Sequence, residues 1–333
     1  MENRRDFLKT AAAGAVLLGS NSNLVLAAAI DRHTEKGKSK VVVARDAALH
    51  TATGQLDEKR VADLLDRAIA AYTGRDKPAE AWKRIVPVGK VIGLKVNGLG
   101  GKPIATHLAL TLAVCERLQK AGVKPSEIVV WESHRGDLER AGYTISTDRN
   151  RIRCIATDME GYGHEEKPAA FGSVSVNLAK ILTRECDFII NLPVLKDHEL
   201  AGVTFSLKNF YGAVQRPGEL HANGCNPAVA DLNCIPALRD KFRLTIGDAT
   251  ASIYEGGPGY RPEHLWYPNA LIVGQDPVAI DYIGWQIIAK KRAELGLPTL
   301  ESAGRPTTFL ATAADAAHKL GTNDPKRIHL MEI

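Results

Sequence analysis

The 333-residue sequence lacks the short motifs by which many enzyme classes are recognised. It has no Walker or dinucleotide-binding glycine spacing, no nucleophile elbow and no zinc-binding helix motif. Its five cysteines include no Cys-x-x-Cys pair, so a zinc or iron–sulfur cluster has no support. The formal net charge of +5 is small and dispersed, so nucleic acid is not expected as a partner. The fold and the site must therefore be inferred from the residues that are present.

The sequence leaves undecided whether one pair of cysteines forms a disulfide. Cys225 and Cys234 lie in a loop-rich region and could pair in an oxidising periplasm. Cys115, Cys154 and Cys186 lie in or beside apolar helix and strand patterns, which favours buried free thiols. Because the number of cysteines is odd, at least one thiol stays free in either case.

The N-terminus has the pattern of an export signal. Arg4 and Arg5 begin a twin-arginine motif that continues Asp-Phe-Leu-Lys. A weakly apolar stretch follows over residues 10–26, and residues 27–29 are alanines suited to cleavage. An amphipathic N-terminal helix is the alternative.

The export pattern sets the expected domain limits and location. We predict a twin-arginine signal peptide at residues 1–29 and a single α/β domain over residues 30–333. Gly14 and the polar residues 20–23 make the leader too polar to span a membrane well, so no stable membrane anchor is expected. The twin-arginine export machinery would deliver the folded chain to the periplasm.

Apolar patterns along the rest of the chain alternate between strand and helix. The longest of the strand patterns, the apolar run 188–195, is of the kind found in strands buried on both faces. This alternation predicts an α/β fold with a largely parallel central sheet and helices on both faces. The expected strands are 41–44, 91–96, 128–131, 152–156, 187–195, 242–246, 271–273 and 328–331, and the expected helices are 57–74, 106–121, 176–184, 228–240, one starting at Asp276-Pro277, and 307–320.

The segment 186–214 has the densest polar chemistry in the chain. It opens with the apolar run 188–195, in which Pro193 is expected near the strand end because proline cannot donate to a sheet ladder. Polar residues follow in two groups, Lys196-Asp-His198 and Lys208-Asn209. Residues 203–214 fit both a strand and a helix, and we favour a helix. A charged loop that caps the sheet is the alternative to a site.

This segment also resembles a known family. The motif comprises Asn191-Leu-Pro-Val-Leu-Lys196-Asp-His198, Gly202-Val-Thr204 and Leu207-Lys208-Asn209 with Gly212. It resembles the family called domain of unknown function 362, and the resemblance implies a fold and a candidate site but no substrate. Many members carry a ferredoxin-like iron–sulfur segment that has no counterpart here, so electron transfer is not implied. The motif is also remotely similar to the nickel-dependent lactate racemases, a likeness that assigns nothing.

Polar residues recur where the predicted strands end. They are Lys95 and Asn97, Glu132 and His134, Asp158, Lys196 and His198, and Asp248. In open α/β sheets ligands bind at the carboxyl edge, so these side chains are expected to meet in one crevice. The turn with Gly100 and Gly101 precedes a helix and could hold an anion with backbone N–H groups, although a plain turn is the alternative.

These residues predict a site for a small anionic or polyhydroxylated ligand. In an enzyme, the lysines would hold negative charge and His198 would act as acid or base. The same site could instead belong to a periplasmic binding or accessory protein without catalysis. The candidate catalytic residues are Lys196, His198, Lys208 and Asn209, and the candidate ligand-binding residues are Lys95, Asn97, Gly100, Gly101, Glu132 and Asp248.

Two further groups in the sequence are candidates for special chemistry. The cofactor is unknown, but a nitrogen and oxygen site for a divalent metal could draw on Glu132, His134, Asp158, His198 and Asp248, which have no fixed short spacing. Asp281 shares an apolar helix stripe with Trp285, so its carboxylate needs a partner or an altered pKa. A structural salt bridge and a catalytic role are both open for Asp281.

Overall fold

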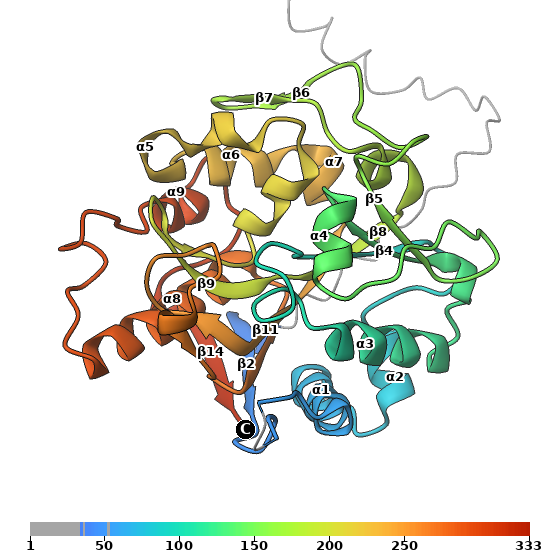
Figure 1. The fold of residues 1–333 in the computed structure, drawn as a ribbon, viewed down its shortest axis with the longest axis horizontal. Helices are drawn as coiled ribbons and strands as arrows, with labels where there is room; N and C mark the ends of the chain where they lie inside the picture. Colours follow the sequence, from blue (N-terminus) through green and yellow to red (C-terminus); the bar gives the residue numbers. More distant parts are fainter. Residues whose placement is uncertain (1–33, 36, 52–53) are drawn as a thin grey trace, which may run out of the picture. The chain divides into compact units, whose positions relative to one another are not determined.

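The centre of the fold is a run of five parallel strands. They adjoin in the order β11, β8, β3, β4, β5, and every neighbouring pair is parallel (Figure 1). The computed structural model describes residues 34–35, 37–51 and 54–333, so the predicted signal peptide lies outside the described residues. The bounds are β3 (Ile92–Val96), β4 (Ile128–Glu132), β5 (Arg153–Ala156), β8 (Phe188–Leu192) and β11 (Phe242–Ile253).

One side of this run continues with antiparallel strands. β13 (Ala270–Gly274) pairs antiparallel with both β11 and β2 (Lys38–Arg45), and β14 (Ile328–Glu332) runs parallel to β2. The prediction of a largely parallel central sheet is confirmed, with an antiparallel flank that the sequence did not indicate. Shorter strands complete the set: β1 (Thr34–Glu35) and β12 (Leu265–Trp266) in the main sheet, and β6 (Ala169–Phe171) with β7 (Val174–Val176) as a separate pair.

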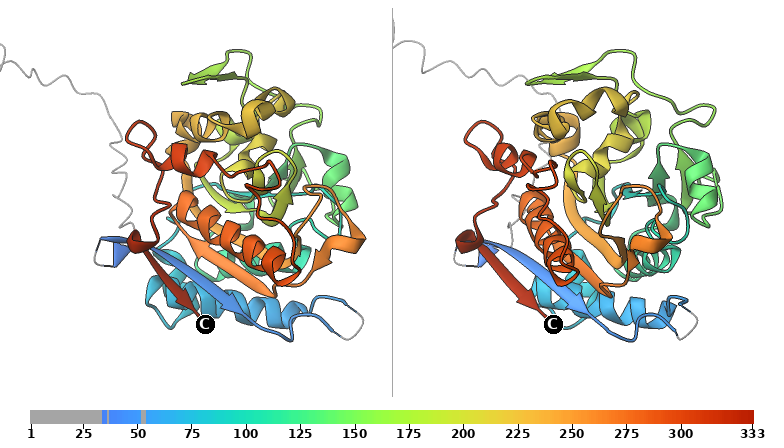
Figure 2. Two further views of the ribbon diagram at one scale, coloured as in Figure 1. Left: turned by 90° about the vertical axis from the view of Figure 1, so that its left-hand side faces the viewer. Right: turned by 60° about the vertical axis from the view of Figure 1, so that its left-hand side comes forward.

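Helices cover both faces of the sheet. Along β2, Val42 and Ala44 pack into one hydrophobic core while Val41 and Val43 pack into the other, because side chains alternate along a strand. α1 lies on the first face and α8 on the second, on opposite sides of β2 (Figure 2). The helices are α1 (Glu58–Thr73), α2 (Pro78–Lys83), α3 (Leu108–Lys120), α4 (Arg135–Arg140), α5 (Ala222–Cys225), α6 (Ala228–Cys234), α7 (Pro236–Arg239), α8 (Pro277–Glu294) and α9 (Phe309–Ala314).

Local rules place the two longest helices. Asp57 caps α1 by accepting from the Arg60 N–H, and Gly74 ends it in the left-handed conformation with φ of 65°. Asp276 caps α8 by accepting from two backbone N–H groups, and proline follows as the first helical residue. These boundaries agree with the sequence predictions. No helix in the described part of the chain is both long enough and apolar enough to cross a membrane.

Several predicted elements have different limits. The strand expected over 187–195 is split by Pro193, and the chain continues as β9 (Val194–His198), which pairs with β10 (Gly202–Thr204) and β11. Residues 203–214 contain the end of β10 and the 3-10 helix η3 (Lys208–Ala213), so the favoured helix is only partly correct. The expected helix 176–184 is the π-helix η2 (Ile181–Glu185), and the expected strand 242–246 continues through Asp248 to residue 253.

Two other predicted helices are shortened or divided in the structure. The helix predicted over 307–320 is limited to α9, and the helix predicted over 228–240 is confirmed as α6 and α7, separated before Pro236. The 3-10 turns are η1 (Pro125–Glu127), η4 (Pro217–His221), η5 (Pro262–His264) and η6 (Pro325–Arg327).

Candidate functional site

A pocket of about 210 Å³ lies where β9 and η3 meet the ends of β3 and β4. Most of the predicted site residues line it, which fits the expectation that the carboxyl edge of the parallel strands holds the site. The polar and charged lining residues are Lys95, Asn97, Glu132, Ser133, His134, Asp137, Lys196, His198, Thr204, Lys208, Asn209, Tyr211 and His221.

Lys95 and Glu132 form a buried ion pair in the wall of this pocket. The Lys95 ammonium donates to Glu132 Oε2 over 2.8 Å and to the Val96 carbonyl over 2.7 Å. Glu132 also accepts from the backbone N–H groups of Gly98 and Ser133. A Cβ at Gly212 would lie 2.7 Å from Glu132 Oε1, so only glycine lets η3 approach the pair this closely. Lys95 and Glu132 therefore fix the wall and have little capacity left for a ligand.

Lys196 is held by three oxygen atoms. Its ammonium donates to Asn97 Oδ1 over 2.8 Å and to the carbonyl oxygens of Leu99 and Ile104 over 3.0 and 3.4 Å. Burial lowers the pKa of Lys196 to about 7, against the attraction of Glu132. The three acceptors use all three ammonium hydrogens, so Lys196 joins β9 to the glycine-rich turn after β3.

A row of asparagine amides links the same elements. Asn97 donates to Asn209 Oδ1 over 3.1 Å, and Asn209 in turn donates to Asn191 Oδ1 over 2.7 Å. Asn209 also reaches the carbonyl of Lys95. The amide row connects β3, β8 and η3, and Asn209 suits its central place because an amide both donates and accepts.

Lys208 differs from Lys95 because no carboxylate forms an ion pair with it, and from Lys196 because its ammonium is not surrounded by three oxygen acceptors. Its ammonium lies 3.0 Å from His221 Nε2 and 3.8 Å from the centre of the Tyr211 ring. Within the described residues it forms no ion pair with a carboxylate, although the side chain is almost completely buried. Burial lowers the pKa of Lys208 to about 8. Lys208 is thus the cation that most needs a negative partner.

His198 is a neutral imidazole in this environment. Its Nδ1 accepts from the backbone N–H groups of Leu200 and Ala201 over 3.1 and 3.2 Å. Burial, followed by the positive charge of Lys208, lowers the pKa of His198 to about 3. The ring stacks beside that of His221, with centroids 5.6 Å apart. A neutral ring can donate a hydrogen bond to a ligand, but it carries no proton to give away as an imidazolium acid.

Three predicted site residues lie outside the pocket lining. Gly100 packs against Ile104, and Gly101 faces the backbone of Arg140, so the turn is a packed connection. Asp248 lies inside β11 and accepts from both the backbone N–H and Nδ1 of His107, each over 2.9 Å. Burial acts to raise the pKa of Asp248, but His107 outweighs it and the pKa is lowered. Asp248 therefore anchors the start of α3.

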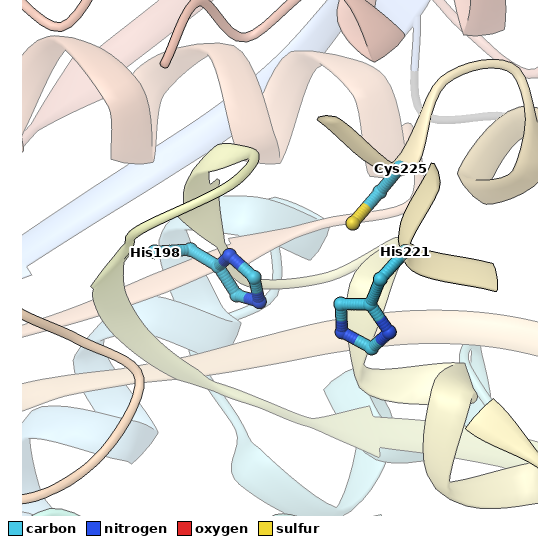
Figure 3. Close-up of side chains that lie close together, drawn as sticks. All are labelled: His198, His221 and Cys225. Carbon is cyan, nitrogen blue, oxygen red and sulfur yellow. The ribbon is translucent and has the colours of Figure 1, made fainter. Parts of the chain in front are cut away.

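The predicted nitrogen and oxygen metal set is not assembled. His134 lies 3.3 Å from Asp158 at an exposed position, while Glu132 is bound to Lys95 and Asp248 to His107. Among the described residues a different group comes together, His198, His221 and Cys225 (Figure 3). The sequence interpretation missed His221 and Cys225. The available signal was their spacing of four residues, which is short enough to bring an imidazole and a thiol together.

The cysteines are all unpaired in the structure. Cys225 and Cys234 form no disulfide, and each of the five thiols is buried. Cys115, Cys154 and Cys186 are core thiols, as predicted, and burial raises the pKa of each to about 12. Cys225 differs from these three because it lies beside two imidazoles and the Lys208 ammonium.

Asp281 is structural in this arrangement. It is fully buried in α8 and accepts from the backbone N–H groups of Ser206 and Leu207 over 2.5 and 3.1 Å. Burial raises the pKa of Asp281 to about 8. The apolar stripe requires a partner for this carboxylate, and the partner is the turn between β10 and η3, which leads directly to Lys208 and Asn209.

Comparisons with known proteins place this motif in a family. A family model described as a domain of unknown function (DUF362) matches residues 92–286, which is more than half of the chain. The chain is also similar to the thylakoid-associated protein sll1697 of Synechocystis sp., at 28% identity over 159 residues. The similarity covers 44% of this chain and 45% of that protein, so the chain matches less than half of its relative's length.

Solved structures give weaker likenesses. A Thermotoga maritima protein matches with 13% identity over 72% of this chain and 59% of its own, at a TM-score of 0.37. The lactate racemase apoprotein from Thermoanaerobacterium thermosaccharolyticum matches with 11% identity over 78% of this chain and 58% of its own, at a TM-score of 0.38. At these scores neither likeness informs the function.

Proposed function

Because this chain belongs to the DUF362 family, whose name assigns no reaction, we propose a function from the pocket itself. The protein binds a small anionic or polyhydroxylated molecule in the pocket and acts on it as an enzyme. The uncompensated charge of Lys208 is the observation that supports this proposal. A buried ammonium without a counter-charge is costly, and an anion in the pocket would neutralise it.

The surroundings of Lys208 suit a small, polar ligand. The ammonium directs hydrogens at His221 Nε2 and at the Cys225 sulfur and has one left for a ligand. Thr204 lines the same space and offers a hydroxyl group for a polyhydroxylated molecule, and the side-chain oxygen of Asn209 can accept a second hydrogen bond. A pocket volume of about 210 Å³ suits a small ligand with a carboxylate or phosphate group. Lys196 and Lys95 shape the walls, while Lys208 and His198 are placed to contact the ligand.

Lys208→Gln is expected to weaken ligand binding by about tenfold to a hundredfold, the worth of a hydrogen bond to a charged group. The measurement is a thermal-shift screen of small carboxylates, phosphates and sugar acids, followed by titration calorimetry of any ligand found. Lys326→Gln removes the same charge from an exposed position and serves as the control. Equal affinities in wild type and Lys208→Gln would contradict the proposed site.

A binding or accessory protein without catalysis is the second candidate function. It is favoured by the wall residues, since Lys95 is paired with Glu132 and Lys196 is surrounded by three acceptors, which leaves both lysines little capacity for chemistry on a ligand. Incubation of the ligand with the protein separates the two functions. Turnover yields a chemically altered product, whereas a binding protein returns the ligand unchanged.

We also propose that the chain is exported to the periplasm by the twin-arginine machinery, on the strength of residues 1–29. Replacing Arg4 and Arg5 together with lysine is expected to retain the protein in the cytoplasm of a bacterial host. Cell fractionation with an antibody measures the distribution. A periplasmic fraction that is unchanged in the double variant would argue against this route.

A further inference from the structure

Two imidazoles and a thiol meet at one end of the pocket. His198, His221 and Cys225 each offer a ligand atom, and these atoms lie within 4.8 Å of one another. Figure 3 shows the two imidazoles facing each other, with the Cys225 sulfur directed toward the space beside them. The three residues come from β9, η4 and α5, so the group is assembled by the fold.

An unusual backbone conformation brings Cys225 to this place. Asn223, Gly224 and Cys225 all have left-handed backbone angles, with φ of 51°, 66° and 66°. Residues other than glycine seldom adopt this conformation, and it is concentrated at functional sites. A Cβ at Gly224 would lie 3.0 Å from the Leu200 carbonyl, so this turn packs directly on the segment that follows His198.

His221 is oriented as a metal ligand would be. Its Nδ1 donates to the Pro217 carbonyl over 2.9 Å, which fixes the neutral tautomer and leaves the Nε2 lone pair on the side of Lys208. Metal-bound histidines in proteins usually have this second hydrogen bond to a backbone carbonyl. The Lys208 ammonium now uses the Nε2 lone pair. A metal ion at this position would displace it.

His198 requires a local rearrangement. Its Nδ1 accepts two backbone N–H groups, so the ring proton sits on Nε2. Coordination through Nε2 moves that proton to Nδ1 and breaks the two contacts with the turn at residues 199–201. Leu200 is 49% exposed, so this turn can rearrange at the surface.

We propose that His198, His221 and Cys225 bind one thiophilic divalent transition metal ion, with Zn²⁺ as the first ion to test. Nitrogen and sulfur donors suit Zn²⁺, and three protein ligands leave a fourth position for solvent or a ligand. Tetrahedral bonds place donor atoms about 3.5 Å apart, so the group must contract modestly. The metal site shares Lys208 and two imidazoles with the pocket of the proposed function, but metal binding requires no anion there.

The displacement of Lys208 gives the proposal a distinctive consequence. The ammonium and the metal compete for the same lone pair on His221, so removing the ammonium favours the metal. Lys208→Gln is therefore expected to bind Zn²⁺ several-fold more tightly than wild type, while its affinity for an anion falls. The two measurements change in opposite directions, which separates a failure of the metal site from a failure of the anion site.

The test uses the full chain after removal of metal with a chelator. Wild type is expected to bind one Zn²⁺ per chain in a competition assay with a chromophoric chelator, and Co²⁺ is expected to give the thiolate-to-cobalt absorption band. His198→Ala, His221→Ala and Cys225→Ser each weaken Zn²⁺ binding by about a hundredfold or more, since loss of a ligand costs at least as much as loss of its supporting hydrogen bond. Cys225→Ser also abolishes the cobalt band.

Controls keep the result independent of folding. Cys234→Ser and His264→Ala replace residues of the same types outside the group and should leave Zn²⁺ affinity unchanged. Circular dichroism and thermal unfolding of each metal-free variant show whether it is folded. Wild-type protein that binds no Zn²⁺ or Co²⁺ would overturn the proposal, as would binding that survives unchanged in folded His221→Ala and Cys225→Ser.

Discussion

Replacing Asp281 with alanine is expected to lower the free energy of unfolding by about 3–5 kcal/mol, among the largest effects of any single change in this chain. The carboxyl group is fully buried and accepts from the backbone N–H groups of Ser206 and Leu207. Alanine leaves both donors buried without an acceptor, and each costs about 1–3 kcal/mol. Chemical denaturation of wild type and variant measures the difference.

Asp281→Asn is the informative second variant. Burial raises the pKa of Asp281 to about 8, so the folded protein keeps the carboxyl protonated at pH values where the unfolded chain has ionised it. The folded pKa lies above the unfolded value of about 3.9, so stability from this group falls as the pH rises between the two values. The stability of wild type relative to Asp281→Asn is therefore expected to decrease from pH 5 to pH 8.

Two results would contradict this account of Asp281. One is a loss in Asp281→Ala no larger than that in Asp63→Ala, which removes an exposed carboxylate from α1 and should change stability by about 0.5 kcal/mol or less. The other is a difference between wild type and Asp281→Asn that stays constant with pH. The first result would show that Asp281 has no structural role. The second would show that its carboxyl group is ionised in the folded protein.

The parts of the fold that obey local rules could be read from the sequence. The run Val41 to Ala44 predicts a strand, and in the structure its side chains alternate between two cores. Asp57 and the Asp276-Pro277 pair predict helix starts, because capping depends on neighbours in the chain. The antiparallel flank could not be read in this way, since strand order and direction depend on distant pairing.

Strand ends were harder to predict than strands. A polar residue after an apolar run predicts a strand end, yet Asp248 lies inside β11 because His107 satisfies its charge. Lys196 likewise lies inside β9, where three oxygens from another segment receive its hydrogens. A buried polar group is tolerated when its partners are present. Those partners lie about a hundred residues away or more, so the sequence does not reveal them.

Most of the pocket lining could be predicted from the sequence, but the end beside His221 and Cys225 could not. Lys95, Asn97, Glu132 and the Lys196 to Asn209 motif meet because parallel strands share a carboxyl edge. His221 and Cys225 come from a turn that contains residues with left-handed backbone angles. A turn of this kind leaves no periodic hydrophobic pattern in the sequence. Their spacing of four residues is compatible with a shared site, but it gains meaning only when His198 is known to lie beside them.

Lys196→Gln is expected to leave the protein folded and to abolish ligand binding. The ammonium joins Asn97, Leu99 and Ile104 to β9, and Asn97 and Leu99 themselves line the pocket. Glutamine is shorter, has two amide hydrogens and carries no charge, so it cannot hold the three oxygens together. The turn after β3 then loses its anchor, and the pocket wall loses its position.

Folding should survive the change because the surrounding strands do not depend on this ammonium. β3 pairs with β8 along its whole length and with β4 over residues 92–95. Burying a lysine is itself costly, which offsets part of the lost hydrogen bonding. Lys196→Arg keeps the charge, but its planar guanidinium is larger and does not match three oxygens arranged around one nitrogen. We therefore expect Lys196→Arg to restore ligand binding only in part.

Urea denaturation and ligand-induced thermal stabilisation, measured on the same samples, test both halves of the prediction for Lys196. Lys326→Gln again serves as the exposed control and should match wild type in both measurements. Full ligand response in Lys196→Gln would show that the wall keeps its shape without the ammonium. A Lys196→Gln protein that fails to fold would instead assign the lysine to stability, because a group needed only to position the pocket leaves the unfolding transition in place.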